Sequence, residues 1–191
     1  MNSSRLEAFT DGVIAIIITI MVLEIHVPRG RDLAALREEV PLFLAYVLSY
    51  INVGIFWNNH HHMLHATERI DGRVLWANLG LLFPLTLVPF VIRWIDEAGL
   101  TTAPVAAYGV VLAGAAIGYL ILERTIIAVN GPNSRLAAAV GSELKGQASL
   151  TLYLLAVPIA FFAPWISIAL YIAVALLWLV PDRRIESQMK R

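Results

Sequence analysis

Six long runs of apolar residues constrain the fold of this chain more than any other feature of its sequence. They cover residues 6–27, 40–62, 74–95, 104–122, 148–162 and 165–180. A helix needs about 20 apolar residues to cross the roughly 30 Å hydrocarbon core of a bilayer, because each residue adds about 1.5 Å. The runs lack the alternation of barrel strands. They predict a single all-α integral membrane domain, residues 1–191, with six transmembrane helices.

The composition agrees with a chain whose main partner is the lipid bilayer. Hydrophobic residues make up 59% and charged residues 15% of the chain, whereas soluble domains average about 45–50% and about 25%. The absence of cysteine excludes disulfides and thiolate metal sites. A formal net charge of zero gives no overall field that would attract nucleic acid. We therefore expect no nucleic-acid partner and no cofactor. The opening MNSSRLEAF lacks the basic start of a signal peptide, so the first run is expected to remain as a span.

Basic residues are distributed unequally between the two sides of the predicted membrane domain, and such residues favour the cytoplasmic side. With the amino terminus inside, ten of them lie on the inner side and four on the outer side. We therefore expect a multi-pass protein of the cell membrane with both termini in the cytoplasm. The inner set is Arg5, Arg69, Arg73, Arg124, Arg135, Lys145, Arg183, Arg184, Lys190 and Arg191, and the outer set is Arg29, Arg31, Arg37 and Arg93.

Asp11 lies about one turn inside the cytoplasmic end of the first apolar run. A charge costs at least about 2.5–3.5 kcal/mol at the bilayer centre and less near the interface. Arg5 lies about 120° away around the same helix, so the two side chains do not stack. Asp11 is either a first-turn anion favoured by the helix dipole or a group that pairs with a neighbouring helix. The residues alone leave both interpretations open.

The segment FWNNHHHMLH closes the second run on the same side of the membrane. His61 and His65 are one helical turn apart and Glu68 follows three residues later, a spacing that could hold a metal. No glutamate separates the histidines as in the His-Glu-x-x-His pattern. We therefore favour histidines that donate hydrogen bonds to carboxylates at the helix ends, and we expect no metal.

The middle of the first run offers Thr19 as its only polar side chain, and its hydroxyl can bond to a carbonyl one turn earlier. Glu24 lies at the outer end, where water can solvate it. The third run is the only candidate for an interrupted helix, because it contains Pro84 and Pro89. A proton-coupled carrier usually has a buried charge near the midplane, and its absence here counts against that class.

The segment Arg5-Leu-Glu-Ala-Phe9-Thr10-Asp11 resembles the Arg-x-x-x-Phe-Ser-Asp signature of the transmembrane protein 175 family, with Thr10 in place of serine. The WNNHHHML stretch resembles that family's tryptophan–histidine region, and the single six-span unit resembles its prokaryotic form. The family includes the lysosomal potassium channel of animals and bacterial relatives. The resemblance implies a non-enzymatic, potassium-permeable channel, with weaker passage of other monovalent cations. It also implies a homotetramer around a central pore that the first helix lines.

The resemblance also assigns roles within the first helix. Ile16 matches the position that narrows the pore in the family, and Ile20 and Leu23 would form further rings one and two turns on. Spacings of four and three keep the three residues on one helix face, although nearly every residue of this helix is apolar. Thr19 matches a threonine near the constriction and would support selectivity. Glu24 is a candidate for the outer mouth, although a solvated helix-end acid is the simpler interpretation.

The resemblance implies that gating and selection depend on a hydrophobic constriction, and the chain likewise has no Thr-Val-Gly-Tyr-Gly filter. A ring of isoleucines expels water and raises the cost of moving a hydrated ion. Asp11 is about 140° around the helix from Ile16 and should point away from the pore. We expect a structural network at the cytoplasmic end of the first helix, made by Arg5, Phe9, Thr10 and Asp11 with His60, His61 and His62.

Two other classes of function stay open at this stage. One is a small secondary transporter or a membrane scaffold that conducts no ions. The other is a membrane-embedded metalloenzyme that uses His61, His65 and Glu68. Ion flux in liposomes separates a channel from a carrier, and metal analysis of purified protein tests the enzyme.

Asp11→Ala is expected to abolish the folded tetramer, because it removes the acid of the predicted network. Size-exclusion chromatography of the purified variant measures this loss. A stable, conducting tetramer formed by Asp11→Ala would contradict the structural role of Asp11.

Overall fold

The computed structural model describes residues 3–179 except 29, 31, 34 and 141–143. All regular elements in this part of the chain are helices. In chain order they are α1 (Ser3–Leu23), α2 (Ala35–His65), α3 (Gly72–Thr86), α4 (Val88–Ala98), α5 (Thr102–Asn130), α6 (Arg135–Val140), α7 (Leu144–Ala160) and α8 (Pro164–Leu179).

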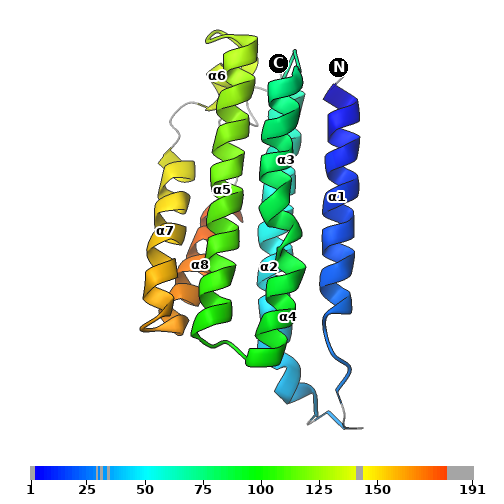
Figure 1. Ribbon diagram of the computed structural model, residues 1–191, viewed down its shortest axis with the longest axis vertical. Coiled ribbons are helices and arrows are strands. Elements are labelled where there is room, and N and C mark those ends of the chain that lie inside the picture. Colours follow the sequence, from blue (N-terminus) through cyan, green and yellow to red (C-terminus); the bar gives the residue numbers. More distant parts are fainter. Residues whose placement is uncertain (1–2, 29, 31, 34, 141–143, 180–191) are drawn as a thin grey trace.

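The long helices form an antiparallel bundle, shown upright in Figure 1. Helix α1 stands at one edge and contacts α2, α3 and α4, whereas α7 stands at the opposite edge and contacts α5 and α8. Helices α3 and α4 run in the same direction as one broken rod. The start of α1, the end of α2 and the start of α3 therefore lie together at one end of the bundle.

Four helical segments of the described chain are long and apolar enough to cross a membrane. They are Ser3–Leu23, Glu39–His65, Gly72–Ala98 and Thr102–Asn130. Helices α7 and α8 are apolar but shorter, with 17 and 16 residues. The sequence prediction of an all-helical membrane protein is confirmed, and four of its six spans are found at full length. The predicted end of the sixth span at Val180 lies outside the described residues.

The helix ends differ from the predicted ones in both directions. Helix α1 ends at Leu23, four residues before the predicted end at Val27, whereas α2 and α5 continue past their apolar runs into polar sequence. Helix α2 begins five residues before the predicted start at residue 40, and α5 continues to Asn130 instead of ending at 122. Gly131 ends α5 and Gly99 ends α4, with φ angles of 95° and 70°. Glycine adopts such angles without steric cost. Ser134 directly precedes α6, and its Oγ accepts a hydrogen bond from the Ala137 backbone N–H at 3.3 Å, as an N-cap side chain does.

The predicted interruption of the third run is confirmed at Leu87, between α3 and α4. Pro84 and Pro89 flank this residue and supply no backbone N–H to the helical ladder. The Leu87 N–H donates to the Pro84 carbonyl at 3.0 Å, and the Leu87 carbonyl accepts from Val91 at 3.1 Å. The break therefore leaves the chain hydrogen-bonded on both sides while it separates the two rods.

The interior beside α5 depends on small residues and on a buried polar cluster. A Cβ added at Gly118 would lie 2.7 Å from the Leu81 Cα and 2.9 Å from the Gly80 carbonyl oxygen, so α3 and α5 approach at backbone contact. Deeper in the bundle the Tyr108 hydroxyl lies 3.0 Å from the Ser49 Oγ and 3.3 Å from the Asn52 Nδ2. These bonds join α2 to α5 within the membrane.

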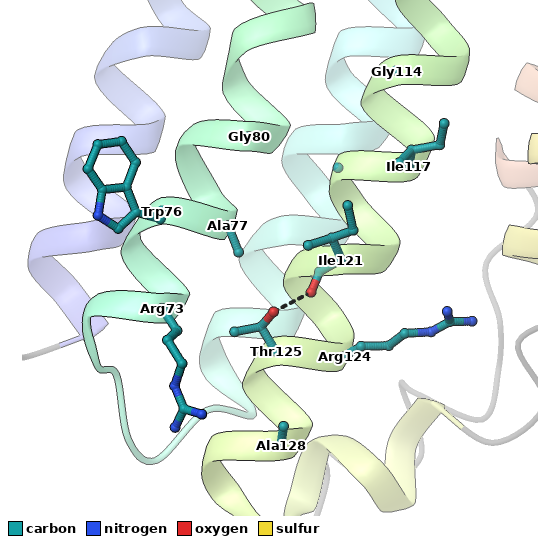
Figure 2. A pocket seen from close by; sticks show the side chains of 11 residues that line it. Arg73, Trp76, Ala77, Gly80, Gly114, Ile117, Ile121, Arg124, Thr125 and Ala128 are labelled. Atoms are coloured by element: carbon teal, nitrogen blue, oxygen red, sulfur yellow. Dashed lines mark hydrogen bonds between the residues drawn. The ribbon is translucent and has the colours of Figure 1, made fainter.

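Figure 2 shows an open groove on the outside of the α3–α5 contact. Its volume is about 740 Å³. Arg73, Trp76 and Arg124 lie toward the end of the groove at which α3 begins, and Gly80 and Gly114 lie along its walls. The glycines make the groove hollow where larger side chains would fill it.

Gly118→Ala is expected to destabilise the protein by about 1–3 kcal/mol, because the added methyl meets backbone that cannot rotate away. Thermal unfolding in detergent measures the change. Gly80→Ala is the matched control on the facing helix, since its added Cβ meets nothing within 4 Å. Equal melting temperatures for the two variants would contradict this account of the α3–α5 contact.

Candidate functional site

Helix α1 has one buried face and one open face. The buried face consists of Leu6, Thr10, Ile14, Ile17 and Met21. The three residues assigned to the pore constriction lie on the open face, where Ile16, Ile20 and Leu23 are 58%, 39% and 80% exposed. The protomer thus leaves this stripe free for another copy, for lipid or for a pore. Exposure alone does not tell a pore-lining residue from one that faces lipid or another copy, because large apolar residues elsewhere, such as Phe83 on α3 at 68%, are exposed as well.

Two further residues singled out from the sequence, Thr19 and Phe9, are also exposed on α1. Thr19 is exposed, and its hydroxyl donates to the Ile16 carbonyl at 2.9 Å, which is the predicted bond to the preceding turn. Phe9 is 51% exposed and lies seven residues before Ile16, about two turns away on the same face. The structure therefore places Phe9 on the open stripe and outside the network within the protomer.

A chain of buried hydrogen bonds fixes the opposite face of α1 to the bundle. The Asn78 Nδ2 donates to the Thr10 Oγ1 at 3.0 Å, and the Asn78 Oδ1 lies 2.8 Å from the His60 Nε2. All three residues are buried. Because lipid cannot satisfy polar groups, this chain ties α1, α3 and α2 together at one relative position.

Asp11 and the remaining signature residues have partners that differ from the expected ones. The Trp57 Nε1 donates to the Asp11 Oδ1 at 2.7 Å, so tryptophan takes the place expected for a histidine. His61 instead contacts Glu7, with 2.7 Å between Nδ1 and Oε1. Arg5 is exposed, and in the described part of the chain the side chains of Arg5 and His62 make no hydrogen bond or ion pair. The His62 ring instead lies edge-on to the His61 ring, with 5.7 Å between centroids. Asp11 therefore connects α1 to α2 through the indole of Trp57.

The other end of α1 is held by ion pairs to α4. Glu24 lies 3.6 Å from Arg93, measured between Oε2 and Nη1, and Arg93 also donates to Glu97 at 3.1 Å. His26 pairs with Asp96. Glu24 is therefore shared with a cation of its own chain, which weakens the field that it could offer to ions at an outer mouth.

Polar side chains bond to the turn between α2 and α3 and fix it to neighbouring helices. Asn130 at the end of α5 receives the backbone N–H groups of Glu68 and Arg69 at 3.2 and 2.7 Å. Asp71 caps α3, and the hydrogen bond from the Arg73 side chain lowers the pKa of Asp71 below its usual value. A lowered pKa means that this carboxylate stabilises the fold above its unfolded pKa and loses that effect as pH falls through its folded pKa.

Sequence reasoning missed three residues of the site: Glu7, Trp57 and Asn78. Asn78 carried a usable signal, because it is a lone amide inside the apolar run 74–95. Glu7 lies one turn before Asp11. That it faces His61 and His65 depends on the rotation of α2, which the sequence does not reveal. The acid that joins His61 and His65 is Glu7, which corrects the set His61, His65 and Glu68 considered for a metalloenzyme.

Comparison with known proteins places this arrangement in a family. The model of a family described as the endosomal/lysosomal potassium channel TMEM175 matches residues 5–89. A Chryseobacterium protein named potassium channel HX13_20290 is 50% identical over 190 residues, which cover 100% of this chain and 99% of the relative. The chain belongs to the TMEM175 family. The family match covers all but the first residues of α1, together with α2 and α3, and it ends at the second residue of α4.

Two further comparisons extend the likeness over most of the chain. Potassium channel Cha6605_3372 of Chamaesiphon minutus is 30% identical over 189 residues, 92% of each chain. The crystal structure of a lysosomal potassium-selective channel TMEM175 homologue from Chamaesiphon minutus superposes with a TM-score of 0.79 at 26% identity. It covers 93% of this chain and 96% of that one. The helical arrangement of this chain is therefore the TMEM175 fold.

Asn78→Ala is expected to destabilise the protein by about 1–3 kcal/mol for each buried partner left unsatisfied, here Thr10 and His60. The midpoint of thermal unfolding in detergent measures the loss. Asn58→Ala is the control, because Asn58 is exposed on α2. Unfolding of both variants at the wild-type temperature would show that the hydrogen-bond chain does not hold α1.

Proposed function

We propose that this chain forms a potassium-permeable cation channel of the cell membrane whose pore is narrowed by isoleucine side chains of α1. The observation that carries the proposal is the division of α1 into a face fixed by buried polar bonds and an open face with Ile16, Ile20 and Leu23. The bacterial relatives are named as potassium channels, which supports potassium as the permeant ion and argues against an enzyme.

The proposed assembly is a homotetramer of six-span subunits with both termini in the cytoplasm. Helices α3 and α4 count together as one span, and α7 and α8 add the fifth and sixth despite their length. Because α1 stands at the edge of the protomer (Figure 1), its open face can meet three copies of itself around an axis. Burial of the open stripe at such an axis would remove large apolar side chains from lipid contact and create a narrow conduit.

The proposed barrier is the cost of taking water from an ion at a ring of four Ile16 side chains. Water leaves a narrow apolar constriction, and a hydrated ion then meets a high barrier. Potassium loses its water more easily than sodium, so potassium is preferred to a modest degree. Thr19 supports this preference in the proposal, because its side chain is exposed and its hydroxyl proton is held by the Ile16 carbonyl, which leaves the oxygen lone pairs available to a cation.

Opening in this proposal is a movement of α1 between two fixed points. One point is the buried chain of Thr10, Asn78 and His60, and the other is the Glu24–Arg93 ion pair. The residues between them are the ones that would line the constriction. A small rotation or bend of this middle segment widens the ring and allows water to enter, while the two ends stay attached to the protomer.

A secondary transporter is the second candidate, because the protomer contains a buried polar cluster that a carrier could use. Ser49, Asn52, Tyr108 and Tyr153 meet between α2, α5 and α7. Their polar atoms are bonded to one another, and none of these side chains is charged at neutral pH. The cluster is therefore better explained as a connection between helices than as a substrate site.

Ile16→Ala is expected to raise potassium flux into liposomes about tenfold, which corresponds to a barrier lowered by about 1.4 kcal/mol. It should also reduce the preference for potassium over sodium, because the ring no longer strips water from the ion. Paired flux assays under potassium and sodium gradients measure both quantities.

Ile172→Ala on α8 is the control, since Ile172 is also an exposed isoleucine and α8 contacts α2, α5 and α7 in the described chain. Its flux should equal that of the wild type. A carrier would lose transport in Ile16→Ala, and either that loss or an unchanged flux would contradict the isoleucine gate.

A further inference from the structure

Glu7, His61 and His65 bring three metal-binding atoms together where the start of α1 meets the end of α2. One oxygen of Glu7 and one ring nitrogen from each histidine all lie within 4.8 Å of one another. The two histidines are four residues apart on α2, so helical geometry holds them on one face. We propose that this cluster is a binding site for a divalent transition-metal ion of the zinc class, which links α1 to α2.

One contact of the cluster has the spacing of two ligands in a tetrahedral site, and another is a hydrogen bond. Ligand atoms bound to zinc at about 2.0–2.2 Å lie about 3.3–3.6 Å apart in tetrahedral geometry. The His65 Nε2 is 3.6 Å from the Glu7 Oε1, which is too long for a hydrogen bond and suitable for two ligands of one ion. The His61 Nδ1 is 2.7 Å from the same oxygen, so this contact has to widen when the ion enters.

The surroundings favour a regulatory site that exchanges its ion with solvent. His65 is 57% exposed, so an ion can enter from water and a water molecule can supply the fourth ligand. The His61 ring stacks on Trp57, with 6.0 Å between ring centroids, and Trp57 is itself fixed by Asp11. One ligand ring is thus oriented before the ion binds, as outer partners orient ligands in metal sites.

The donor set indicates the class of ion. Two imidazoles and one carboxylate suit zinc and neighbouring transition metals, whereas magnesium and calcium prefer oxygen ligands. Binding would lock the first turns of α1 to α2. Its effect on ion flux rests on the proposed function: the bound ion stiffens the fixed end against which the middle of α1 rotates, and so resists that rotation. Binding itself does not depend on that function.

Isothermal titration calorimetry of the intact, tag-free protein with zinc chloride tests the site. Wild type should bind one zinc ion per chain, and Glu7→Gln, His61→Ala and His65→Ala should each weaken binding at least tenfold. His62→Ala is the matched control and should keep wild-type affinity, because His62 is the neighbouring histidine outside the cluster. Magnesium chloride should give no binding at the same concentration.

Two results of the titration would overturn the site. One is equal zinc binding by wild type and the double variant His61→Ala/His65→Ala. The other is loss of binding in His62→Ala as in the cluster variants. Size-exclusion profiles that match the wild type establish that the variants are folded, and a zinc-dependent rise in the melting temperature of wild type but not of Glu7→Gln gives a second measurement of the same site.

Potassium flux into liposomes tests the consequence for gating separately. Zinc should lower the flux of wild type and leave that of the double variant unchanged. If zinc binds to the cluster and flux does not fall, the gating consequence is wrong while the site stands. If flux is absent without zinc, the proposed channel function fails, and the titration still decides the site.

Discussion

The arrangement of α1 depends on one chain of hydrogen bonds, from Thr10 through Asn78 to His60. In a bilayer, apolar faces gain little by touching one another instead of lipid, so apolar packing alone fixes the rotation of a helix weakly. A buried amide that must satisfy two partners fixes it strongly. With Thr10 directed inward, helical geometry turns Ile16, Ile20 and Leu23 outward. The open face of α1 thus follows from a polar contact on its other side.

The sequence predicts well those features that the bilayer itself dictates. The apolar runs located α1, α2, α5 and the broken α3–α4 span because the length of a crossing is fixed by membrane thickness, and Pro84 and Pro89 located the break. Contacts between helices were predicted less well. We expect from the sequence that Asp11 meets a histidine, but in the structure Asp11 bonds to Trp57 and Glu7 contacts His61. Trp57 and His61 lie one turn apart on α2, so the rotation of α2 decides which of them faces which acid.

The two halves of the bundle are held together by different kinds of contact. Helices α1 to α4 contain the hydrogen-bond chain, the Glu24–Arg93 pair and the residues that the family model matches. Helices α5, α7 and α8 pack beyond them, through Gly118 and through the buried tyrosines Tyr108, Tyr153 and Tyr171. The family model matches residues up to 89, whereas the structural likeness to the Chamaesiphon minutus channel homologue covers 93% of this chain.

The break at Leu87 has a consequence for the position of α1. It divides the third candidate span into two rods, and each rod holds a different end of α1. Asn78 on α3 bonds to Thr10 near the start of α1, whereas Arg93 on α4 pairs with Glu24 just beyond its end. A change in the angle between the two rods therefore shifts one attachment against the other, and α1 has to bend or turn to follow it.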